Sequence, residues 1–586
     1  QVLRVDDIPL IYAQVKELGV QQTIDSKVVA HGNWSGISLG HMISLWLCYL
    51  LSESNHRLSS VEDWATENLS LLGALSGELK ISGKDFTDDR LEQALDYISK
   101  PNNWLEISIG LNTNGLSVYD LSTVQTVRLD SAPMQGHHQV KPGGLFQYGY
   151  SKHHDPRLGM LKVMLASVDN EVNGFGYPLA HLTVSGEKAD DGLYIPLIKE
   201  CEQVFKNGDY NERKLYVGDA KIGSIKNRSY IVSTKNDYLT PLSKIQLPAM
   251  VRSKKINGVD EKAYKKVYKK GKTGKRELVA QGFEEEVDMN YTGSDGIKNE
   301  WKERRIFVLS TAYSLAQKKA LDNHLTKVEI GITDLVITKQ GKTISTTEVE
   351  LQQRIEELLG DKGLGQLLNV EIKKEIQTRQ IRAYKERPTR KEKKVSFSLK
   401  INRDEAAIEA HKKTLGWQVY ATSAKKKELN FEKCVWKYRY QNRVERQFDN
   451  LRNKVVPLVP IFVQQDNRVE ALINLLMICL KLCAVMEYKI AKQLKVNQEK
   501  LDNIYEGNPK RSTASPTANR LLKSFKGISL VIIGGNKLEP VPTIKLTDLK
   551  QVQLKIIELL GFQQNLYEDL VAEIQLFFSK KKISET

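Results

Sequence analysis

Residues 193–219, LYIPLIKECEQVFKNGDYNERKLYVGD, predict a helix that leads into a short buried strand. The first part of this stretch is amphipathic with a helical period, and Lys214–Val217 reads as a strand that ends in Gly218 and Asp219. A strand that returns to a sheet after a helix is expected to run parallel to its neighbour. Open α/β sheets bind ligands at the carboxyl ends of such strands, so Asp219 is a candidate site residue. The alternative role of Asp219 is an N-cap for the residues that follow.

The segment before this helix has the texture of strands. Residues 114–129 (NGLSVYDLSTVQTVRL) alternate and are β-branched, 143–169 indicate two strands around a polar turn, and 171–187 indicate another strand. The order β-β-β-α-β predicts an α/β fold with a mixed sheet. Asp120 falls in the middle of the first strand, where Asp is disfavoured, and a ligand role would explain it. A turn or edge-strand position is the alternative.

A basic helix is predicted at 438–452, YRYQNRVERQFDNLR. Its apolar face has a helical period and consists of Tyr440, Val444, Phe448 and Leu451. Glu445 lies at the edge of this face, between positively charged neighbours: Arg439, Arg443, Arg446 and Arg452. An intrahelical ion pair is the simplest explanation for Glu445. A helix that packs on the predicted sheet would instead bring Glu445 towards the two aspartates.

Three converging carboxylates repel one another unless a cation neutralises them. Oxygen-only ligands suit Mg²⁺ or Mn²⁺, and two such ions support phosphoryl transfer. The composition agrees with this chemistry, because 87 Lys and Arg against 71 Asp and Glu give a formal net charge of +16. Such a balance favours a polyanionic partner, first nucleic acid and second an acidic membrane surface.

The cysteines and the apolar stretches indicate a soluble intracellular protein. Five cysteines without a CxxC pair favour a reducing compartment, and Cys479 and Cys483 read as core thiols. The first residues lack the continuous apolar region of a signal peptide. The two most apolar stretches, 37–51 and 471–480, are too short to span a membrane and read as buried core helices.

Composition and texture divide the chain into five parts. Residues 236–414 read as an insertion rich in strands and basic loops, with charge runs at 252–276 and 373–400 and a strand-like stretch at 328–351. A charge run usually marks a solvated face. The expected parts are an N-terminal helical domain (1–103), the first part of a catalytic core (104–235), the insertion (236–414), the second part of the core (415–495) and a C-terminal α/β tail (496–586).

The chain resembles the DDE transposases of bacterial insertion sequences, in the group with a β-rich insertion between the second Asp and the Glu (the insertion-sequence family four type). The most specific pieces are GYSKHHDP and RVERQF. The matching stretches follow the family order and are TDDRLEQALD (87–96), VYDLSTV (118–124), GYSKHHDPRLGMLKVML (149–165), GYPLAHLTVSGEKADD (176–191), YVGDAKI (216–222), YRYQNRVERQFDNLR (438–452) and VVPLVPIFVQQDNRVEALINLLMICL (455–480).

This resemblance implies an RNase H-like core in which Asp120, Asp219 and Glu445 bind two Mg²⁺ ions, with Mn²⁺ as a substitute. It also implies cleavage of double-stranded DNA at terminal inverted repeats and strand transfer of the 3′-hydroxyl into target DNA. The expected setting is a homodimer on DNA in a prokaryotic cytoplasm, at the nucleoid and away from membranes. The residues expected to contact DNA are Tyr438, Arg439, Arg443, Arg446, Arg452, Lys454 and Lys152.

The helix around Glu445 departs from the family pattern, Tyr-x2-Arg-x3-Glu-x6-Lys. Gln441 stands at the Arg place and Arg452 at the Lys place, and Arg443 and Lys454 are the candidate substitutes. A catalytically degenerate DNA-binding protein is therefore one alternative function, and another RNase H-like nuclease is a second. Trp301 and Trp417 are candidates for stacking on an unpaired base, with a core position as the alternative.

Overall fold

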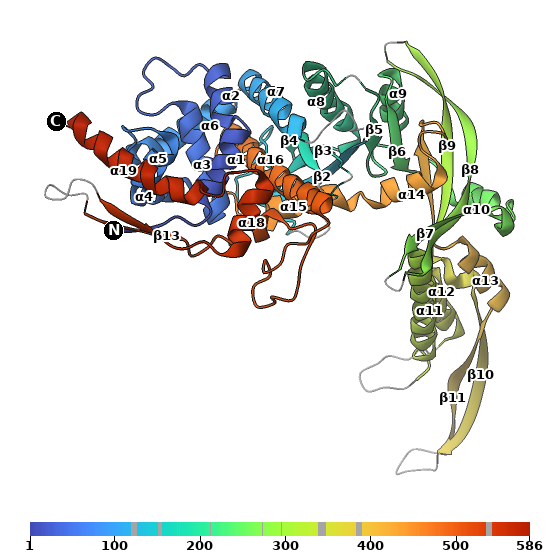
Figure 1. Cartoon of the computed structure of the whole chain (residues 1–586). Helices are drawn as coiled ribbons and strands as arrows, with labels where there is room; N and C mark the ends of the chain where they lie inside the picture. The colour runs from blue at the N-terminus through green and yellow to red at the C-terminus, as the bar shows by residue number, and fades with distance from the viewer. Residues whose placement is uncertain are drawn as a thin grey trace. The chain divides into compact units, whose positions relative to one another are not determined.

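The computed structural model describes residues 1–118, 126–149, 155–170, 172, 174, 176–210, 212–271, 274–294, 296–337, 347–381, 389–453, 455–534 and 542–585 (Figure 1). The fold is mixed α/β. It divides into two compact units. Unit 1 comprises 1–240, 288–302 and 436–586, and unit 2 comprises 241–287 and 303–435.

Unit 1 begins with a group of helices, as the sequence predicts. These are α1 (Ile8–Glu17), α2 (Val20–Lys27), α3 (Leu39–Glu53), α4 (Val61–Glu67), α5 (Leu69–Ser76), α6 (Asp88–Ile98) and α7 (Pro101–Val118). α6 starts after the N-cap residue Thr87, and Asp88 and Asp89 lie in its first turn, where negative charge is favourable. The apolar stretch at 37–51 falls mostly in α3, whose side chains from Leu45 to Leu51 are all buried.

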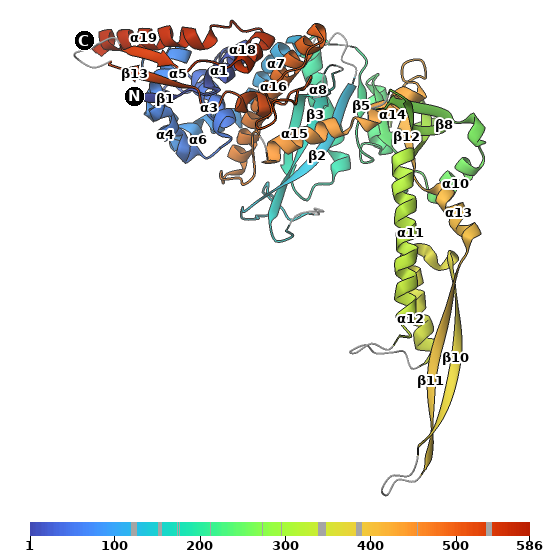
Figure 2. The same cartoon turned by 60° about the horizontal axis from the view of Figure 1, so that its bottom comes forward.

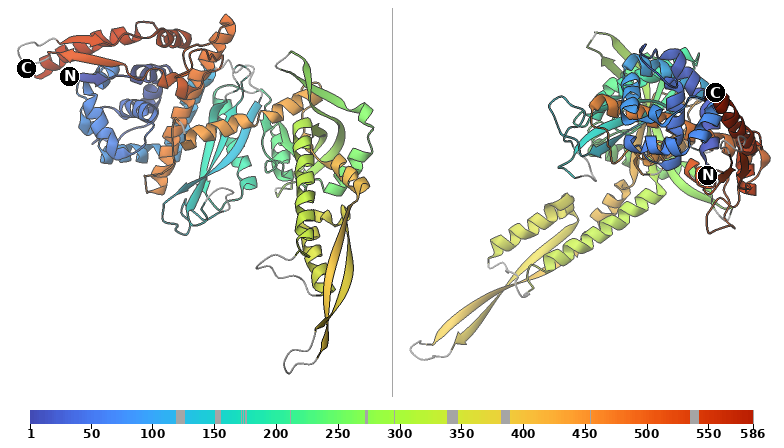
Figure 3. Two further views of the ribbon diagram at one scale, coloured as in Figure 1. Left: turned by 90° about the horizontal axis from the view of Figure 1, so that it is seen from below. Right: turned by 90° about the vertical axis from the view of Figure 1, so that its left-hand side faces the viewer.

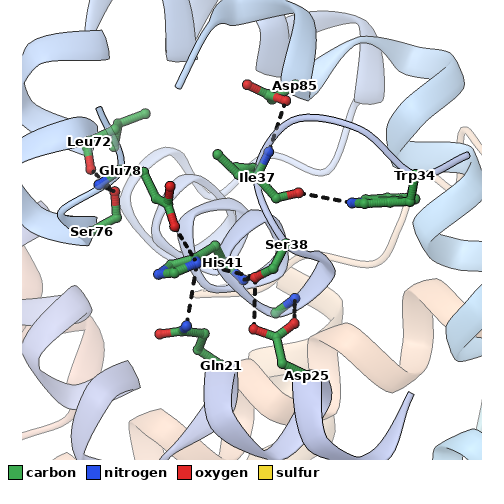
Figure 4. Close-up of polar contacts among 11 residues, drawn as sticks. Gln21, Asp25, Trp34, Ile37, Ser38, His41, Leu72, Ser76, Glu78 and Asp85 are labelled. Atoms are coloured by element: carbon green, nitrogen blue, oxygen red, sulfur yellow. Dashed lines mark hydrogen bonds and ion pairs between the residues drawn. The ribbon is translucent and has the colours of Figure 1, made fainter. Parts of the chain in front are cut away.

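Polar contacts hold the start of α3 against α2 (Figure 4). The Ser38 hydroxyl accepts a hydrogen bond from the His41 amide and so caps α3. Asp25 of α2 accepts from the Gly40 amide at 2.7 Å and from the Ser38 hydroxyl at 2.7 Å. The imidazole of His41 lies 3.0 Å from the Glu78 carboxylate. A side chain at position 40 would collide with α2, so the close approach of these two helices requires glycine there.

Five strands of unit 1 form a mixed sheet in the order β4-β3-β2-β5-β6. They are β2 (Thr126–Gly136), β3 (Gly159–Val168), β4 (Tyr177–Ser185), β5 (Leu215–Val217) and β6 (Asp237–Pro241). β2, β3 and β4 are antiparallel neighbours, whereas β5 runs parallel to both β2 and β6. α8 (Tyr194–Asn207) connects β4 to β5, and α9 (Ile225–Ser233) connects β5 to β6. Three antiparallel strands, a helix and a parallel strand are present in the predicted order, but the first strand predicted within 143–169 is reduced to an isolated bridge between Gln147 and Met160.

The longest helix of unit 1, α16 (Asp466–Asn497), is a core element. It is long and apolar enough to cross a membrane, but 94% of its most apolar window is buried inside the protein. It packs on α6, on β4 and on α18 (Gln551–Leu560). Cys479 and Cys483 are buried in it, as expected for core thiols. This burial favours the core helix of a soluble protein.

The two ends of the chain meet in a small sheet with the order β1-β13-β14. β1 (Val2–Arg4) pairs with β13 (Ser529–Ile533), which pairs with β14 (Thr543–Leu546), both in the antiparallel sense. The helices of this C-terminal region are α17 (Ala518–Lys523), α18 (Gln551–Leu560) and α19 (Leu566–Glu585). The tail therefore belongs to the same hydrophobic core as the N-terminal helices.

Unit 2 combines a sheet with a helical group and a long ribbon (Figures 2 and 3). Its sheet has the order β12-β9-β8-β7, from β7 (Lys265–Lys270), β8 (Arg276–Thr292), β9 (Lys298–Ser310) and β12 (Trp417–Thr422). Its helices are α10 (Ala249–Asn257), α11 (Thr311–Thr333), α12 (Glu348–Gly360), α13 (Glu405–Thr414) and most of α14 (Phe431–Arg439). The ribbon consists of β10 (Leu368–Ile381) and β11 (Arg390–Arg403).

Two strand predictions are wrong. Residues 114–118 end helix α7 instead of starting a strand, because Ile107, Leu111 and Gly115 form a helical face that packs inward. The described parts of 328–351 belong largely to α11 and α12. There Leu325, Val328 and Ile332 recur at helical spacing and are buried, so core packing outweighs the strand preference of the β-branched residues.

The single helix predicted at 438–452 is also wrong, because the chain turns at Tyr440 and Gln441 between α14 and α15 (Asn442–Asn453). The carbonyl oxygen of Lys437 would accept the Gln441 amide in a continuous helix, but it accepts the Arg128 guanidinium at 2.8 Å instead. The Gln441 amide donates to Tyr438 O, one residue closer.

Candidate active site

Two neighbouring parallel strands bring acidic side chains together. In the pairing of β2 with β5, Arg128 lies opposite Val217. The same register continued for two residues places Asp130 beside Asp219. Close contact persists over this interval, since a Cβ on Gly218 would lie 3.3 Å from a carbonyl oxygen of β2. The two carboxylates therefore leave adjacent strands at the same level of the sheet.

The Asp219 carboxylate is held by hydrogen bonds to its own neighbourhood. The Tyr194 hydroxyl of α8 donates to Asp219 Oδ1 at 2.8 Å, and the Lys221 amide donates to the same oxygen at 2.9 Å. The Thr240 hydroxyl donates to the Asp219 carbonyl oxygen at 2.7 Å. Burial and the Asp219 charge both raise the pKa of Tyr194, so this phenol remains a donor. Asp219 is thus fixed just beyond the carboxyl end of β5.

Asp130 carries the electrostatic signature of a crowded acidic site. Burial raises its pKa to about 7, and the charges of Asp219, Glu445 and Asp190 add to the shift, while a hydrogen bond from the Ser131 amide opposes it. Shifts of this size arise where like charges converge in a partly desolvated place. Glu445 of α15 is therefore an electrostatic neighbour of Asp130, although its own side chain is exposed.

Tyr438, at the end of α14, belongs to the same group. Burial raises the pKa of its phenol, and the charges of Asp219, Asp130 and Glu445 add to the effect in that order. The side chain is half-buried. One phenol thus lies within the field of the three carboxylates, where it can donate a hydrogen bond to an anionic oxygen.

A buried ion-pair network joins the strand that carries Asp130 to the helix that carries Glu445. Asp169 follows β3 and pairs with Arg128 at 2.8 Å and with Arg443 at 2.5 Å. Arg128 lies two residues before Asp130, and Arg443 lies two residues before Glu445. The Asp169 carboxylate therefore links strand β2 to helix α15 close to the site.

Glutamine side chains add two further contacts between α15 and the sheet. The Gln441 side-chain amide donates to Leu129 O of β2 at 2.9 Å. Gln447 accepts a hydrogen bond from the Ser167 hydroxyl at 3.0 Å and donates to Gly176 O. The apolar face of α15 is buried as predicted at Val444, Phe448 and Leu451, whereas Tyr440 is 39% exposed. These contacts fix the rotation of the helix, and with it the direction of Glu445.

The structure describes two of the three acids in the predicted triad. Asp219 and Glu445 lie where the sequence places them, at a strand end and on a helix that packs against the sheet. Asp120 lies outside the described residues. The structure places Asp130 within electrostatic range of Asp219 and Glu445, and the sequence interpretation missed it because the predicted strand stopped at Leu129. The missed signal is that apolar residues continue on both sides of Asp130, with Leu129, Ala132 and Met134 all buried, which puts one acid inside a strand.

The predicted DNA contacts fall into three groups. Lys152 and Lys454 lie outside the described residues. The Arg443 and Arg452 side chains turn into the protein, since Arg443 pairs with Asp169 and Arg452 donates to Pro133 O at 3.4 Å. Three remain near the carboxylates or at the surface: Tyr438, Arg439, which stacks over the Trp436 ring, and Arg446, which is exposed.

The two tryptophan candidates are engaged inside the protein. Trp417 is 5% exposed, packs edge-on against Tyr264 and Phe283, and is a core residue. Trp301 is half-buried and its indole donates to the Tyr238 hydroxyl at 2.9 Å.

The donor set around Asp130 fits a hard divalent cation by its chemistry. In the part of the chain that the structure describes, no group of three or more His, Cys, Asp or Glu side chains lies close enough together to form a ready-made metal cage. Mg²⁺ does not require such a cage, because it keeps several waters and commonly takes one or two protein carboxylates. Burial is the main cause of the raised pKa of Asp130, and the charges of Asp219 and Glu445, which a cation would neutralise, add to it.

A comparison with family models adds one finding. A domain of unknown function, DUF4277, matches residues 1–104, which contain the N-terminal helices. This domain occurs at the N-terminus of transposase-like proteins. A comparison with curated proteins gives no match.

Proposed function

We propose that the protein is a DDE-type DNA transposase whose acidic triad is Asp130, Asp219 and Glu445. The observation that carries the proposal is the placement of Asp130 and Asp219 side by side on parallel strands, with the charge of Glu445 acting on Asp130. Asp130 takes the place that the sequence resemblance gave to Asp120. The match of the N-terminal residues to a domain of transposase-like proteins supports the same assignment.

The sheet of unit 1 supports an RNase H-like core. Three antiparallel strands come first in the chain, and the next two strands run parallel to the first of them, β2. β2 is therefore the middle strand of β4-β3-β2-β5-β6. One catalytic acid on the central strand and another just beyond the adjacent parallel strand agrees with the site rule for sheets that change direction.

Asp130, Asp219 and Glu445 would hold two Mg²⁺ ions, or Mn²⁺ in their place. When bound, the ions would activate the attacking oxygen and stabilise the leaving oxygen of a phosphodiester. The chain's own residues orient these ligands: Tyr194 and the Lys221 amide hold Asp219, and the Asp169 network holds α15. Because Asp130 lies beside two other acids, cation binding would also relieve their repulsion.

Surface groups around the triad would hold the DNA backbone. Tyr438 can donate to a phosphate oxygen near the carboxylates, and Arg446 presents positive charge from α15. Arg443 is a positioning residue in this proposal, because its guanidinium is committed to Asp169. The net charge of +16 supplies the longer-range attraction for a polyanion.

The test is a cleavage assay on labelled DNA that carries the ends of the protein's own element. We expect nicks at the element boundary in Mg²⁺ and none in Ca²⁺. Asp130→Asn and Asp219→Asn should each abolish cleavage, whereas Asp120→Asn and the exposed control Asp191→Asn should retain it. Full activity of Asp130→Asn would refute the assignment of Asp130, and loss of activity in Asp120→Asn alone would restore the family alignment.

A second candidate function is a DNA-binding protein without catalysis. Gln441 at the place of a family arginine favours it, because Gln441 is used to hold β2 through Leu129 O. Under this alternative the protein would bind DNA with strong salt dependence and give no cleavage in any divalent ion. Detection of strand-transfer products in the same assay would favour the transposase over both this alternative and a simple nuclease.

A further inference from the structure

The ribbon of unit 2 has a covered inner half and a bare outer half. β10 and β11 pair continuously from Leu368 opposite Arg403 to Ile381 opposite Arg390. The inner half packs on the core of α11 and α12 through Val370, Ile372, Phe397, Leu399 and Ile401. In the outer half, which begins at Glu375 opposite Ser396, every side chain from Glu375 to Gln380 is exposed. Figures 2 and 3 show the ribbon extending beyond the ends of these helices.

The outer half of the ribbon has no other part of the described chain packed on either of its faces. A two-stranded ribbon alone is marginally stable, because it lacks a layer on which to pack. Here it also exposes an apolar pair in its centre, since Ile376 is 57% exposed and Val395, directly opposite, is 41% exposed. A partner that covers this face would account for both features.

The charge of the outer half identifies the kind of partner. The described residues of its two strands, 375–381 and 390–396, contain five Lys and Arg against two Glu. Two copies of such a ribbon would repel each other, whereas a polyanion would be attracted. Among the described side chains of this half, Arg379, Lys391 and Lys393 are exposed to solvent. The complementary surface is therefore strongly negative and shaped to receive a narrow two-stranded element.

We propose that the outer half of the β10–β11 ribbon binds duplex DNA by lying in the major groove. The inference rests on the proposed function and adds a contact surface to it. The major groove is about 12 Å wide and accepts a two-stranded ribbon. Six residues from Glu375 to Gln380 span about 20 Å, which is more than half of one helical turn of about 34 Å.

The side chains suit the two surfaces of that groove. Lys391, Lys393 and Val395 alternate along β11 and share one face of the ribbon with Ile376, whereas Arg379 lies on the opposite face. With the shared face turned into the groove, Ile376 and Val395 would meet the base edges, where thymine presents its methyl group. The long side chains of Lys391 and Lys393 on this face, and of Arg379 from the other face, would contact the phosphates that border the groove. The cations would supply most of the affinity, and the apolar pair would supply the part that salt does not weaken. This division makes the two kinds of residue separable by experiment.

The test measures the salt dependence of binding to a random-sequence linear duplex by the full chain. Replacing Arg379, Lys391 and Lys393 by Gln should make the log–log salt slope shallower by up to about 2.7, at about 0.9 per phosphate contact, and weaken binding on the order of 100-fold at low salt. The matched control replaces Lys319, Lys327 and Lys413 of unit 2, which are exposed on helices, and should leave the slope close to wild type. Replacing Ile376 and Val395 by Thr should weaken binding without changing the slope.

The groove is tested with a duplex whose cytosines carry a bulky group at C5, which fills the major groove. We expect the wild-type chain to bind this modified duplex more weakly than ordinary DNA. The triple Gln variant should bind the modified duplex and ordinary DNA equally. Equal binding of both duplexes by the wild-type chain would overturn insertion into the major groove.

The outcomes separate this inference from the proposed function. If the wild-type chain cleaves its element ends and the triple Gln variant binds DNA like the control, the ribbon proposal alone fails. If the variant changes sedimentation of the free protein instead of DNA binding, the ribbon is a contact between copies and the proposal is overturned. If the wild-type chain binds no duplex at low salt, both the ribbon proposal and the transposase assignment fail.

Discussion

Replacing Asp130 by Asn is expected to stabilise the protein above pH 7 while abolishing cleavage. The Asp130 carboxylate is half-buried and lies among the charges of Asp219 and Glu445, which together with burial raise its pKa to about 7. Asn keeps the oxygen that accepts the Ser131 amide at 2.9 Å, so the local hydrogen bond survives. The substitution therefore removes one charge with little change of shape.

The size and the pH window follow from the pKa. An ordinary Asp has a pKa of about 4, so the shift is about three units, which corresponds to about 4 kcal/mol at 1.36 kcal/mol per unit. Residual solvent contact screens the charges, and we expect about 2 kcal/mol. Because the folded state holds its proton more tightly than the unfolded state, wild-type stability falls as the pH rises from about 4 to about 7 and then levels off. The gain from Asn is therefore absent at pH 4 and complete at pH 8.

The assay is differential scanning calorimetry of the metal-free protein at pH 4 and pH 8. For a unit of about 400 residues, 2 kcal/mol corresponds to a rise of about 2 °C in the unfolding transition of unit 1. The exposed Asp191→Asn variant is the control and should show no such dependence on pH. A rise of the same size at both pH values, or a loss of stability at pH 8, would refute the crowding of Asp130 by the other acids.

Three further predictions concern other parts of unit 1. Asp169→Ala leaves Arg128 buried without its carboxylate and should cost about 3 kcal/mol in urea unfolding, whereas Asp155→Asn, which removes an exposed pair with Arg157, should leave stability almost unchanged. Glu487 is buried, its pKa is raised to about 8, and its carboxylate accepts a hydrogen bond from the Ala518 amide. The wild-type protein should therefore lose up to about 5 kcal/mol of stability as the pH rises from about 4.5 to about 8, and Glu487→Gln should abolish this loss. A variant with the wild-type pH profile would contradict this prediction. Gly115→Ala should destabilise the protein by about 1–3 kcal/mol, because a Cβ there would lie 2.3 Å from the Tyr177 hydroxyl, and Tyr177→Phe should restore part of the loss; a neutral Gly115→Ala would argue against the helix at 114–118.

The elements with strong periodicity were predictable, and those with mixed signals were not. Amphipathic spacing predicts both α6 and α8, and the acids in the first turn of α6 also mark where that helix starts. A short apolar run before Gly218 predicts β5. Residues 114–118 begin an alternating stretch whose later residues, from Val118 on, are rich in β-branched side chains that suit a strand. Residues 114–118 are helical because Gly115 allows α7 to approach Tyr177, a contact between residues distant in the chain.

The break between α14 and α15 depends on a single distant side chain. The period of Val444, Phe448 and Leu451 indicates a helix in which Glu445 lies at the edge of the buried face, and this is what the structure shows. No local pattern indicates that Arg128, about three hundred residues earlier, takes the carbonyl oxygen of Lys437 and ends α14.

The sequence by itself determined the basic character of the chain, the α/β order around Asp219, and a carboxylate at position 445 on the edge of a buried helical face, because composition and periodicity are local properties. Which described acid lies at the level of Asp219 is decided by the tertiary structure. Asp130 and Asp120 are both acids in or near a β-branched stretch, and local preference does not separate them. The register between β2 and β5 carries Asp130, the one acid of β2, to the level of Asp219, because Arg128 pairs with Val217, whereas Asp120 lies outside the described residues. Register is set by which faces are buried across the whole sheet, and that information is not contained in either strand alone.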